Sequence, residues 1–317
     1  MLSLLGLVPS DQGAFSSQAT HPNHLGKPEH PRAPSFLAGP AENVALGTAR
    51  VESHSWTKTS NTPFSTGQGE FQLLDVYKPA GSAPAGGWPV LIAIHGGGWR
   101  RFSKDQYGPR IASAFAPRGY VVVAPNYALS APGRPTWPAN FEDVEAAVRW
   151  VREQAKFLDI NPNQVAAIGE SAGANLAALL GTSAASGRVD GVSSQVNAVI
   201  AFSTPTDLTN LYEQSFLGGL AAAQFLGGAP PQVPASYTAA SPIDHLSPAD
   251  SPMFLVHGLQ DPLIPVNQSE ELAAALAAEG VPHQLVLVSG SHNLDFPAHY
   301  AKLIPQILAF LSATWKD

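Results

Sequence analysis

The fold of this chain is decided by one stretch, Val165-Ala166-Ala167-Ile168-Gly169-Glu170-Ser171-Ala172-Gly173, and by the Ala- and Leu-rich residues 174–180 that follow it. The first four residues are apolar, as in a short strand buried on both faces, and the residues after Ser171 favour a helix. The two glycines flanking Ser171 leave room for the sharp turn that a nucleophile between a strand and a helix requires. The stretch therefore predicts that Ser171 is a nucleophile. The alternative is a glycine-rich turn in which the serine only caps the helix.

The segments around this stretch alternate between strand-like and helix-like patterns. Residues 140–157 place apolar side chains at the spacing of one helix face, whereas residues 90–94 form a short run rich in Val and Ile. Strands are expected at residues 71–77, 90–94, 120–124, 165–168, 196–202, 253–256 and 284–288, and helices at 140–157, 172–180, 268–278 and 300–311. Repeated alternation of this kind predicts the α/β class, with a doubly wound, mostly parallel sheet.

Two regions depart from the alternation. Residues 1–68 contain seven prolines among many Ser, Thr, Gly and His residues and show no sustained period, so we expect an irregular arm before one domain at residues 69–317. Residues 204–252 are rich in Gly, Pro and Ala and lie between two expected strands. Connections of this length are usually functional or contain helices, so we expect a small cap insertion beside the active site.

The composition limits the classes of protein. Of the 317 residues, 44% are hydrophobic and 13% are charged, which is enough apolar material for a core and too much for a disordered chain. The net charge is −7 and no basic run occurs, so nucleic acid is not an expected partner. The chain has no cysteine, which excludes disulfides, thiolate metal sites and a cysteine nucleophile.

Targeting and metal signals are weak. No apolar stretch reaches the roughly 18 residues of a membrane span. Residues 1–8 are apolar but lack the positively charged start of a complete secretory signal, and the compartment, cytoplasmic or secreted, stays open. His21, His24 and His30 are separated by prolines and have no further ligand cluster, so we expect no metal site there.

A second glycine-rich motif, His95-Gly96-Gly97-Gly98-Trp99, follows the expected strand at residues 90–94. Consecutive glycines allow backbone N–H groups to approach a substrate closely. We predict that the N–H groups of Gly97, Gly98 and Ala172 surround a developing oxyanion. The alternative is a merely flexible loop. We expect His95 to bond the loop backbone rather than to titrate in catalysis.

An acid and a base are expected at the carboxyl ends of later strands, where doubly wound sheets place their ligands. Asp261 follows the expected strand at residues 253–256, and His292 follows the one at 284–288. We predict that His292 takes the proton of Ser171, while Asp261 fixes the tautomer of His292 and stabilises its imidazolium. His257 precedes Asp261 too closely to be the base. The other candidates fit less well by position; they are Asp207, Asp244, Asp250, Asp295, His283 and His299.

Together these residues resemble the α/β-hydrolase superfamily, in particular carboxylesterases with a His-Gly-Gly-Gly loop. Within it the chain is similar to the hormone-sensitive-lipase-related esterases and to the bifunctional feruloyl and acetyl-xylan esterase type. The resemblance runs from about Glu70 to the C-terminus and is carried by residues 75–77, 95–99, 124–127, 170–173 and 261–266 and by the helix around Asp143. It implies an acyl-serine intermediate, the oxyanion donors named above and no cofactor. Ala128 departs from the pattern, since an arginine usually stands there.

The leading prediction is a serine carboxylic ester hydrolase that acts on short-chain or aryl esters of small molecules. Trp99 is the aromatic residue that we most expect to line the substrate pocket, although most aromatic residues of the chain are expected in the core or cap. Two other functions stay open. An amide hydrolase of the arylformamidase type would use the same groups, and a non-catalytic ligand-binding protein of this fold would not require them.

Overall fold

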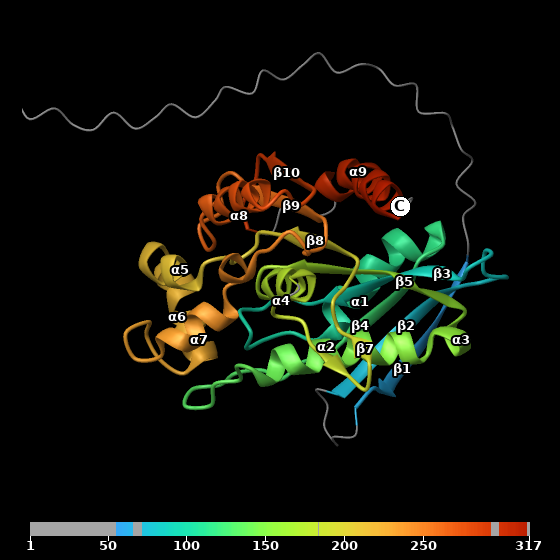
Figure 1. Ribbon diagram of the computed structural model, residues 1–317, viewed down its shortest axis with the longest axis horizontal. Helices are drawn as coiled ribbons and strands as arrows, with labels where there is room; N and C mark the ends of the chain where they lie inside the picture. The colour runs from blue at the N-terminus through green and yellow to red at the C-terminus, as the bar shows by residue number, and fades with distance from the viewer. Residues whose placement is uncertain (1–54, 66–71, 183, 293–297, 316–317) are drawn as a thin grey trace, which may run out of the picture. The chain divides into compact units, whose positions relative to one another are not determined.

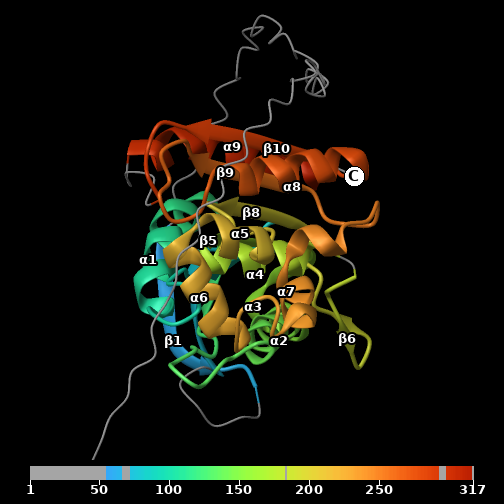
Figure 2. The ribbon, with the colours of Figure 1, turned by 90° about the vertical axis from the view of Figure 1, so that its left-hand side faces the viewer.

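The computed structural model describes residues 55–65, 72–182, 184–292 and 298–315. Its centre is an eight-stranded sheet in the order β1-β2-β4-β3-β5-β8-β9-β10 (Figures 1 and 2). The bounds of the strands are β1 Trp56–Pro63, β2 Leu73–Pro79, β3 Trp88–Ile94, β4 Val121–Pro125, β5 Ile160–Glu170, β8 Ala198–Phe202, β9 Met253–Gly258 and β10 His283–Val288. Strands β1 and β2 pair antiparallel, and β2 pairs antiparallel with β4. All pairs from β4 to β10 are parallel, so the predicted α/β class with a mostly parallel sheet is confirmed.

Helices cover both faces of the sheet because its central strands are apolar on both sides. In β3, Val90, Ile92 and Ile94 belong to one buried cluster, and Leu91 and Ala93 belong to the other. The first cluster includes side chains of α2 (Ala139–Glu153), α3 (Ala155–Leu158), α4 (Ala172–Gly181) and α8 (Asn267–Ala278). The second includes side chains of α1 (Lys104–Phe115), a short 3₁₀ turn (Ala116–Arg118) and α9 (Ala298–Thr314). The alternation along each strand therefore builds a separate core on each face.

Strand β1 corrects one expectation. Residues 56–63 were assigned to the irregular arm, but they pair with β2 along its length. The side chains of β1 are almost all exposed, so the strand has no apolar alternation that the sequence could reveal. In the rest of the expected arm, the structure also describes Ser55, Phe64 and Ser65. Residues 1–54 and 66–68 lie outside the described residues.

Helix α1 is absent from the elements that the sequence predicts. It contains Gly108 and Pro109, which both argue against a helix. The structure gives a reason for the glycine, because a Cβ at Gly108 would lie 2.7 Å from the Cβ of Ala124 in β4. The helix begins with a capping box in which Ser103 accepts from the N–H of Asp105 and Gln106 reaches back to the N–H of Ser103.

The long segment at residues 204–252 contains helices of its own. They are α5 (Leu208–Gln214), α6 (Phe216–Leu226), α7 (Pro234–Ala240) and a 3₁₀ turn (Pro242–His245) (Figure 2). The hydroxyl of Ser215 accepts from the N–H of Gly218 at the start of α6 and donates to the carbonyl of Leu263 at 2.7 Å. Helix α6 is therefore fastened to the loop that follows Asp261.

Two further observations complete the fold. Strands β6 (Arg188–Val189) and β7 (Val192–Ser193) form a small hairpin apart from the main sheet. Of the helices in the described segments, none is long and apolar enough to cross a membrane.

Candidate active site

Ser171 occupies a sharp turn between β5 and α4. Its backbone has φ 56° and ψ −124°, a conformation that costs free energy for any residue with a Cβ. The turn is held by backbone hydrogen bonds, because the N–H of Ser171 donates to the carbonyl of Phe202 at 2.8 Å and its carbonyl accepts from Ala174 and Asn175. A strained serine between a strand and a helix is the geometry that the sequence motif predicts.

The two glycines of the motif are required by close backbone approach. A Cβ at Gly169 would overlap the carbonyl of Gly173. A Cβ at Gly173 would overlap the carbonyl of Ile94 and lie 2.5 Å from that of His95. Helix α4 therefore lies directly against the ends of β5 and β3, with no space for side chains between them.

Replacing Gly173 with alanine is expected to lower the free energy of unfolding by about 3 kcal/mol. The new Cβ meets backbone atoms of Ile94 and His95, which cannot rotate away as a side chain can. Urea unfolding monitored by circular dichroism would measure the change.

Gly187→Ala is the matched control for this prediction. A Cβ at Gly187 would meet only the carboxylate of Glu145, at 3.4 Å, so its unfolding free energy should change by less than about 0.5 kcal/mol. Equal effects of the two variants would contradict the close approach at Gly173.

The glycine loop after β3 lies beside Ser171. A Cβ at Gly96 would be 3.5 Å from the Cβ of Ser171, and Gly97 and Gly98 have φ angles of 113° and 61°. In the part of the chain that the structure describes, the N–H groups of Gly97, Gly98 and Ala172 donate to no other group. The glycine loop and the turn at Ser171 thus contribute three backbone N–H groups without an acceptor among the described residues, as an oxyanion site requires.

His95 and Tyr127 stabilise the start of this loop. The two rings stack with centroids 4.2 Å apart, and the hydroxyl of Tyr127 donates to the carbonyl of His95 at 2.8 Å. Burial lowers the pKa of His95 to about 4, although its hydrogen bond to the Gly96 carbonyl acts in the opposite direction. His95 is therefore neutral at pH 7, and its Nδ1–H donates to Gly96.

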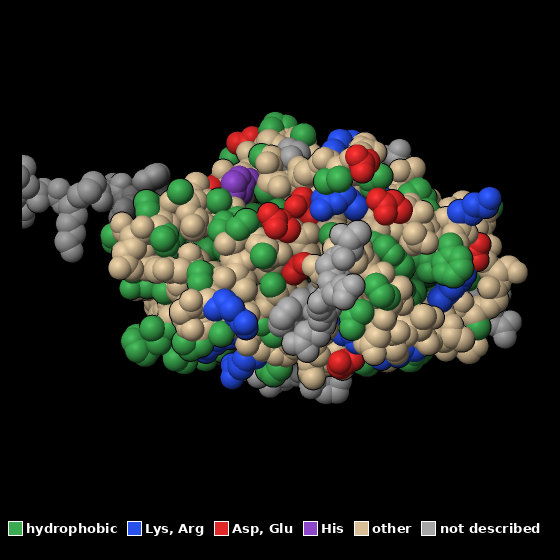
Figure 3. Space-filling view, turned by 90° about the horizontal axis from the view of Figure 1, so that it is seen from below, with side chains coloured by type: hydrophobic (Ala, Val, Ile, Leu, Met, Phe, Trp, Pro, Cys, Tyr) green, Lys and Arg blue, Asp and Glu red, His purple; other side chains and the backbone are tan. Residues whose placement is uncertain are grey.

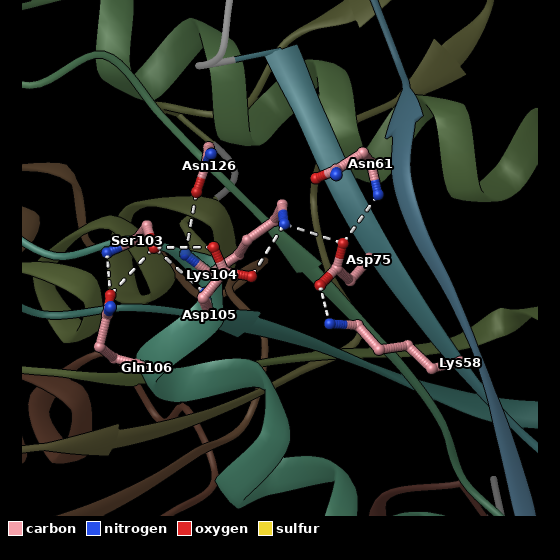
Figure 4. A network of polar contacts seen from close by, with 8 residues as sticks. All are labelled: Lys58, Asn61, Asp75, Ser103, Lys104, Asp105, Gln106 and Asn126. Carbon is pink, nitrogen blue, oxygen red and sulfur yellow. Dashed lines mark hydrogen bonds and ion pairs between the residues drawn. The ribbon is translucent and has the colours of Figure 1, made fainter.

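A buried ion pair anchors the other end of the loop, where α1 begins (Figure 4). The Nζ of Lys104 lies 2.9 Å from Asp75 Oδ1 and 3.1 Å from Asp105 Oδ1. Asp75 also pairs with Lys58 at 2.7 Å, and the N–H of Lys104 donates to Asn126 Oδ1. The network joins β1, β2 and the residue after β4 to the first turn of α1, so the end of the glycine loop is fixed to the sheet.

Replacing Lys104 with methionine is expected to lower the free energy of unfolding by about 3 kcal/mol at pH 7, because it leaves a buried carboxylate without its buried partner. Burial alone would raise the pKa of Asp75, but Lys58, the N–H of Asn61 and Lys104 hold it below 3.8. A depressed carboxylate stabilises the fold above its ordinary pKa, and that stabilisation is lost as the pH falls below it. The difference between the variant and the wild type should therefore shrink below about pH 3.8 in urea unfolding series.

Lys58→Met is the matched control, because Lys58 binds the same carboxylate from a partly exposed position. Its effect should stay below about 1 kcal/mol. A larger loss from Lys58→Met than from Lys104→Met would show that burial does not decide the strength of this pair.

Asp261 and His292 are in direct contact. Asp261 Oδ2 lies 2.7 Å from His292 Nδ1, and Oδ1 accepts from the N–H groups of Leu263 and Ile264, each at 2.9 Å. Burial alone would raise the pKa of Asp261, but hydrogen bonds donated by His257, by His292 and by the backbone N–H of Ile264 lower it well below its usual value. Asp261 is therefore an ionised carboxylate that accepts from the Nδ1–H of His292, and among the described residues Nε2 has no hydrogen-bond partner.

His257 is a neighbour of this pair that the sequence did not assign to the site. Its ring is fully buried, with Nδ1 2.6 Å from the hydroxyl of Ser269 and Nε2 2.9 Å from the carbonyl of Ile264. Nε2 also lies 3.4 Å from Asp261 Oδ2. Since Nε2 faces two acceptors, it carries the proton and helps to hold Asp261. The signal in the sequence is the spacing of four residues between His257 and Asp261.

His292 lies at the same edge of the sheet as Ser171. The hydroxyl of Ser203, the residue after β8, donates to the carbonyl of His292 at 3.4 Å, and the preceding residue, Phe202, accepts from the N–H of Ser171. Within the described residues, no hydrogen bond joins Ser171 Oγ to His292 in this conformation. Catalytic hydrogen bonds often tighten only when substrate binds.

Trp99 and Glu170 have partners inside the protein. The indole of Trp99 is only 2% exposed and stacks on Phe225 of α6 with ring centroids 4.5 Å apart. In this conformation the indole packs under α6 and does not form the exposed wall of a substrate pocket. Glu170, the residue before Ser171, pairs with Arg110 of α1 at 2.9 Å.

Across the segments that the structure describes, no group of three or more His, Cys, Asp or Glu side chains could hold a metal. His21, His24 and His30 lie outside those segments. On the face drawn in Figure 3, basic and acidic side chains are interspersed, and no broad basic area is visible.

The chain is similar to a known family and to proteins named as esterases. A family model described as BD-FAE matches residues 74–276. The esterase LipQ of Mycobacterium tuberculosis (strain ATCC 25618 / H37Rv) is 32% identical over 228 residues, which cover 70% of this chain and 53% of LipQ. The probable carboxylic ester hydrolase LipM of the same organism is 29% identical over 261 residues, or 78% of this chain and 60% of LipM. The chain thus spans little more than half the length of these relatives.

Solved structures share the fold. Thermogutta terrifontis esterase 2, in a form phosphonylated by sarin, superposes with a TM-score of 0.65 at 27% identity, covering 76% of this chain and 90% of that chain. A truncated form of a carbohydrate esterase from gut microbiota superposes with a TM-score of 0.72 over 84% of this chain and 98% of that chain. The latter is 23% identical and shows the fold alone.

Proposed function

This protein belongs to the BD-FAE family of α/β hydrolases, and from that premise we propose that it is a serine esterase that hydrolyses short-chain or aryl carboxylic esters. The observation that carries the proposal is the contact between Asp261 and His292 at the sheet edge that also holds the strained Ser171. The names of LipQ and LipM, an esterase and a probable carboxylic ester hydrolase, support the same reaction class.

In the proposed reaction, Ser171 Oγ attacks the ester carbonyl carbon while His292 Nε2 takes the hydroxyl proton. The N–H groups of Gly97, Gly98 and Ala172 donate to the oxyanion that forms. His292 then gives its proton to the departing alcohol, which leaves an acyl group on Ser171. A water molecule, deprotonated by His292, then attacks this acyl group. The bond between the acyl carbon and Ser171 Oγ breaks, His292 returns the proton to Oγ, and the carboxylic acid is released. Asp261 stays ionised throughout and stabilises the imidazolium.

The expected size of the substrate follows from the cap. A Cβ at Gly98 would lie 3.5 Å from the Cβ of Ala221 in α6, so this helix passes close to one of the proposed oxyanion donors. The indole of Trp99 is buried beneath the same helix. This proximity favours small acyl or aryl groups over long alkyl chains.

Titration with diethyl p-nitrophenyl phosphate tests the nucleophile. We expect one p-nitrophenolate to be released per chain, with the adduct on the peptide that contains Ser171, by mass spectrometry. The absence of an adduct would count against an acyl-serine mechanism and would favour a non-catalytic ligand-binding protein.

The second candidate reaction is amide hydrolysis, because the same nucleophile and base can serve it. Phenyl acetate and N-formylkynurenine compared at equal concentration separate the two reactions. An esterase should turn over phenyl acetate with the higher kcat/KM. The reverse order would identify an amide hydrolase of the arylformamidase type.

A further inference from the structure

Phe102 adopts a backbone conformation that a bulky residue rarely takes. Its φ is 72°, in the left-handed region where a Cβ crowds the backbone. Burial does not offset this strain, because the side chain is 55% exposed. A strained, exposed aromatic residue is stable here only because its neighbours fix the chain, and such outliers cluster at functional sites.

The loop around Phe102 is fixed without help from its ring. On one side, the carbonyl of Trp99 accepts from both the N–H and the hydroxyl of Ser130. On the other, Ser103 forms the capping box of α1, and Lys104 is held in its buried ion pair (Figure 4). The ring itself is therefore not needed to order the loop.

The ring lies beside the proposed oxyanion donors. Its Cδ2 is 2.9 Å from the position that a Cβ on Gly97 would occupy, and the guanidinium of Arg101 lies 5.6 Å from the ring centroid. Gly98, the next donor, faces Ala221 of α6. Each of the two glycines thus has an apolar neighbour, the ring of Phe102 at Gly97 and Ala221 of α6 at Gly98.

Helix α6 carries further exposed apolar side chains, since Leu217 and Leu220 are each about half exposed. The ring of Phe102 and helix α6 are therefore apolar surfaces close to the proposed oxyanion donors, where an ester would bind. Aromatic groups pack well against both, and ring–ring contacts add an attraction beyond buried area.

We propose that Phe102 is a specificity-determining residue whose ring packs against the aromatic group of an ester substrate. The inference rests on the proposed esterase function and assigns to Phe102 the preference for an aromatic over an alicyclic ester. The strain at Phe102 is then the cost of presenting the ring beside the oxyanion donors, rather than a requirement of folding.

The test compares esters of matched size with and without aromaticity. Phenyl acetate is paired with cyclohexyl acetate, and ethyl benzoate with ethyl cyclohexanecarboxylate, so that the ring is varied on either side of the ester bond. For Phe102→Leu, we divide kcat/KM for the aromatic ester by kcat/KM for the alicyclic ester. This ratio should fall roughly three- to tenfold relative to the wild type in at least one pair, because the attraction between the two rings is lost. Differences in leaving group cancel in this comparison.

A second variant separates a substrate role from a structural one. Phe102→Gly should lower the same ratio and also raise Tm by about 2 °C, because glycine adopts positive φ without strain. Phe102→Leu retains the strained φ and should leave Tm unchanged. The matched control is Asp190→Gly, which relieves a φ of 49° in the hairpin of β6 and β7 and should raise Tm without changing the ratio.

Three outcomes would overturn the inference: an unchanged ratio in both pairs, an equal fall in kcat/KM for all four esters, or a fall in Tm for Phe102→Gly. The wild type distinguishes this failure from failure of the proposed function. If it turns over the esters but the variants keep its ratios, only the role of Phe102 is wrong. If it neither turns over an ester nor reacts with the organophosphate, the proposed function fails and the inference fails with it.

Discussion

Replacing Ser171 with alanine is expected to lower kcat for phenyl acetate by about 10⁴-fold or more. The variant loses the oxygen that would form the acyl intermediate, whereas the proposed oxyanion donors remain. Its free energy of unfolding should change little, because alanine has the same steric cost as serine at φ 56° and the backbone hydrogen bonds of the turn persist. Steady-state kinetics and urea unfolding of the same preparation would measure both quantities.

Ser203→Ala is a matched control for this experiment. Ser203 also has a positive φ, 49°, and follows the neighbouring strand β8, but its hydroxyl donates to a backbone carbonyl. We expect a loss of no more than about tenfold in kcat from this variant. Comparable losses from the two variants would mean that Ser171 contributes to the local structure rather than to the chemistry.

Replacing Asp261 with asparagine is expected to lower kcat by about 10⁴-fold, the effect that an uncharged partner of a catalytic histidine has in other serine hydrolases. An asparagine that accepts from the N–H groups of Leu263 and Ile264 presents its amide group to His292. His292 then holds its proton on Nε2, where it cannot act as a base. The kcat of the variant against phenyl acetate would measure this loss.

The same substitution has an expected effect on stability that depends on pH. The pKa of Asp261 is held below its usual 3.8, so its ionised form stabilises the fold above that pH, and this contribution is lost as the pH falls further. The stability difference between Asp261→Asn and the wild type should therefore be present at pH 7 and decline below about pH 3.8.

Asp207→Asn is the control for both measurements. Asp207 is a rival acid in the sequence, but its carboxylate accepts from the N–H of Asn210 and caps α5, a role that asparagine performs equally well. This variant should retain kcat within about tenfold. A loss of kcat as large as that of Asp261→Asn would show that the acid has been assigned to the wrong residue.

The sequence predicts the central elements well because their residues are apolar on both sides or follow a helical period. Strand β3 and helix α4 lie within one or two residues of their expected positions. Strand β1 and helix α1 escape prediction because tertiary contacts form them. Strand β1 is an exposed strand that pairs with β2, and α1 accommodates Gly108 and Pro109 where it passes close to β4.

The site shows the same division between local and distant information. Asp261 and His292 each follow a strand, so their meeting at one edge can be expected from the topology. The second partner of Asp261, His257, lies in β9 only four residues before it, but the spacing alone does not bring the two side chains together; the turn after β9 does. The burial of Trp99 depends on Phe225, which lies in a cap whose sequence has no clear period.

The backbone contact between Gly173 and Ile94 has a consequence for how this chain can diverge. Folding and the proposed catalysis constrain two nearby positions by independent means: Gly173 has no space for any side chain, whereas Ser171 is required for its hydroxyl. Selection for folded protein alone would retain the glycine and let the serine drift. An inactive descendant would therefore still carry the glycines of the turn, and the loss would be seen at Ser171 or at its proposed partners, Asp261 and His292.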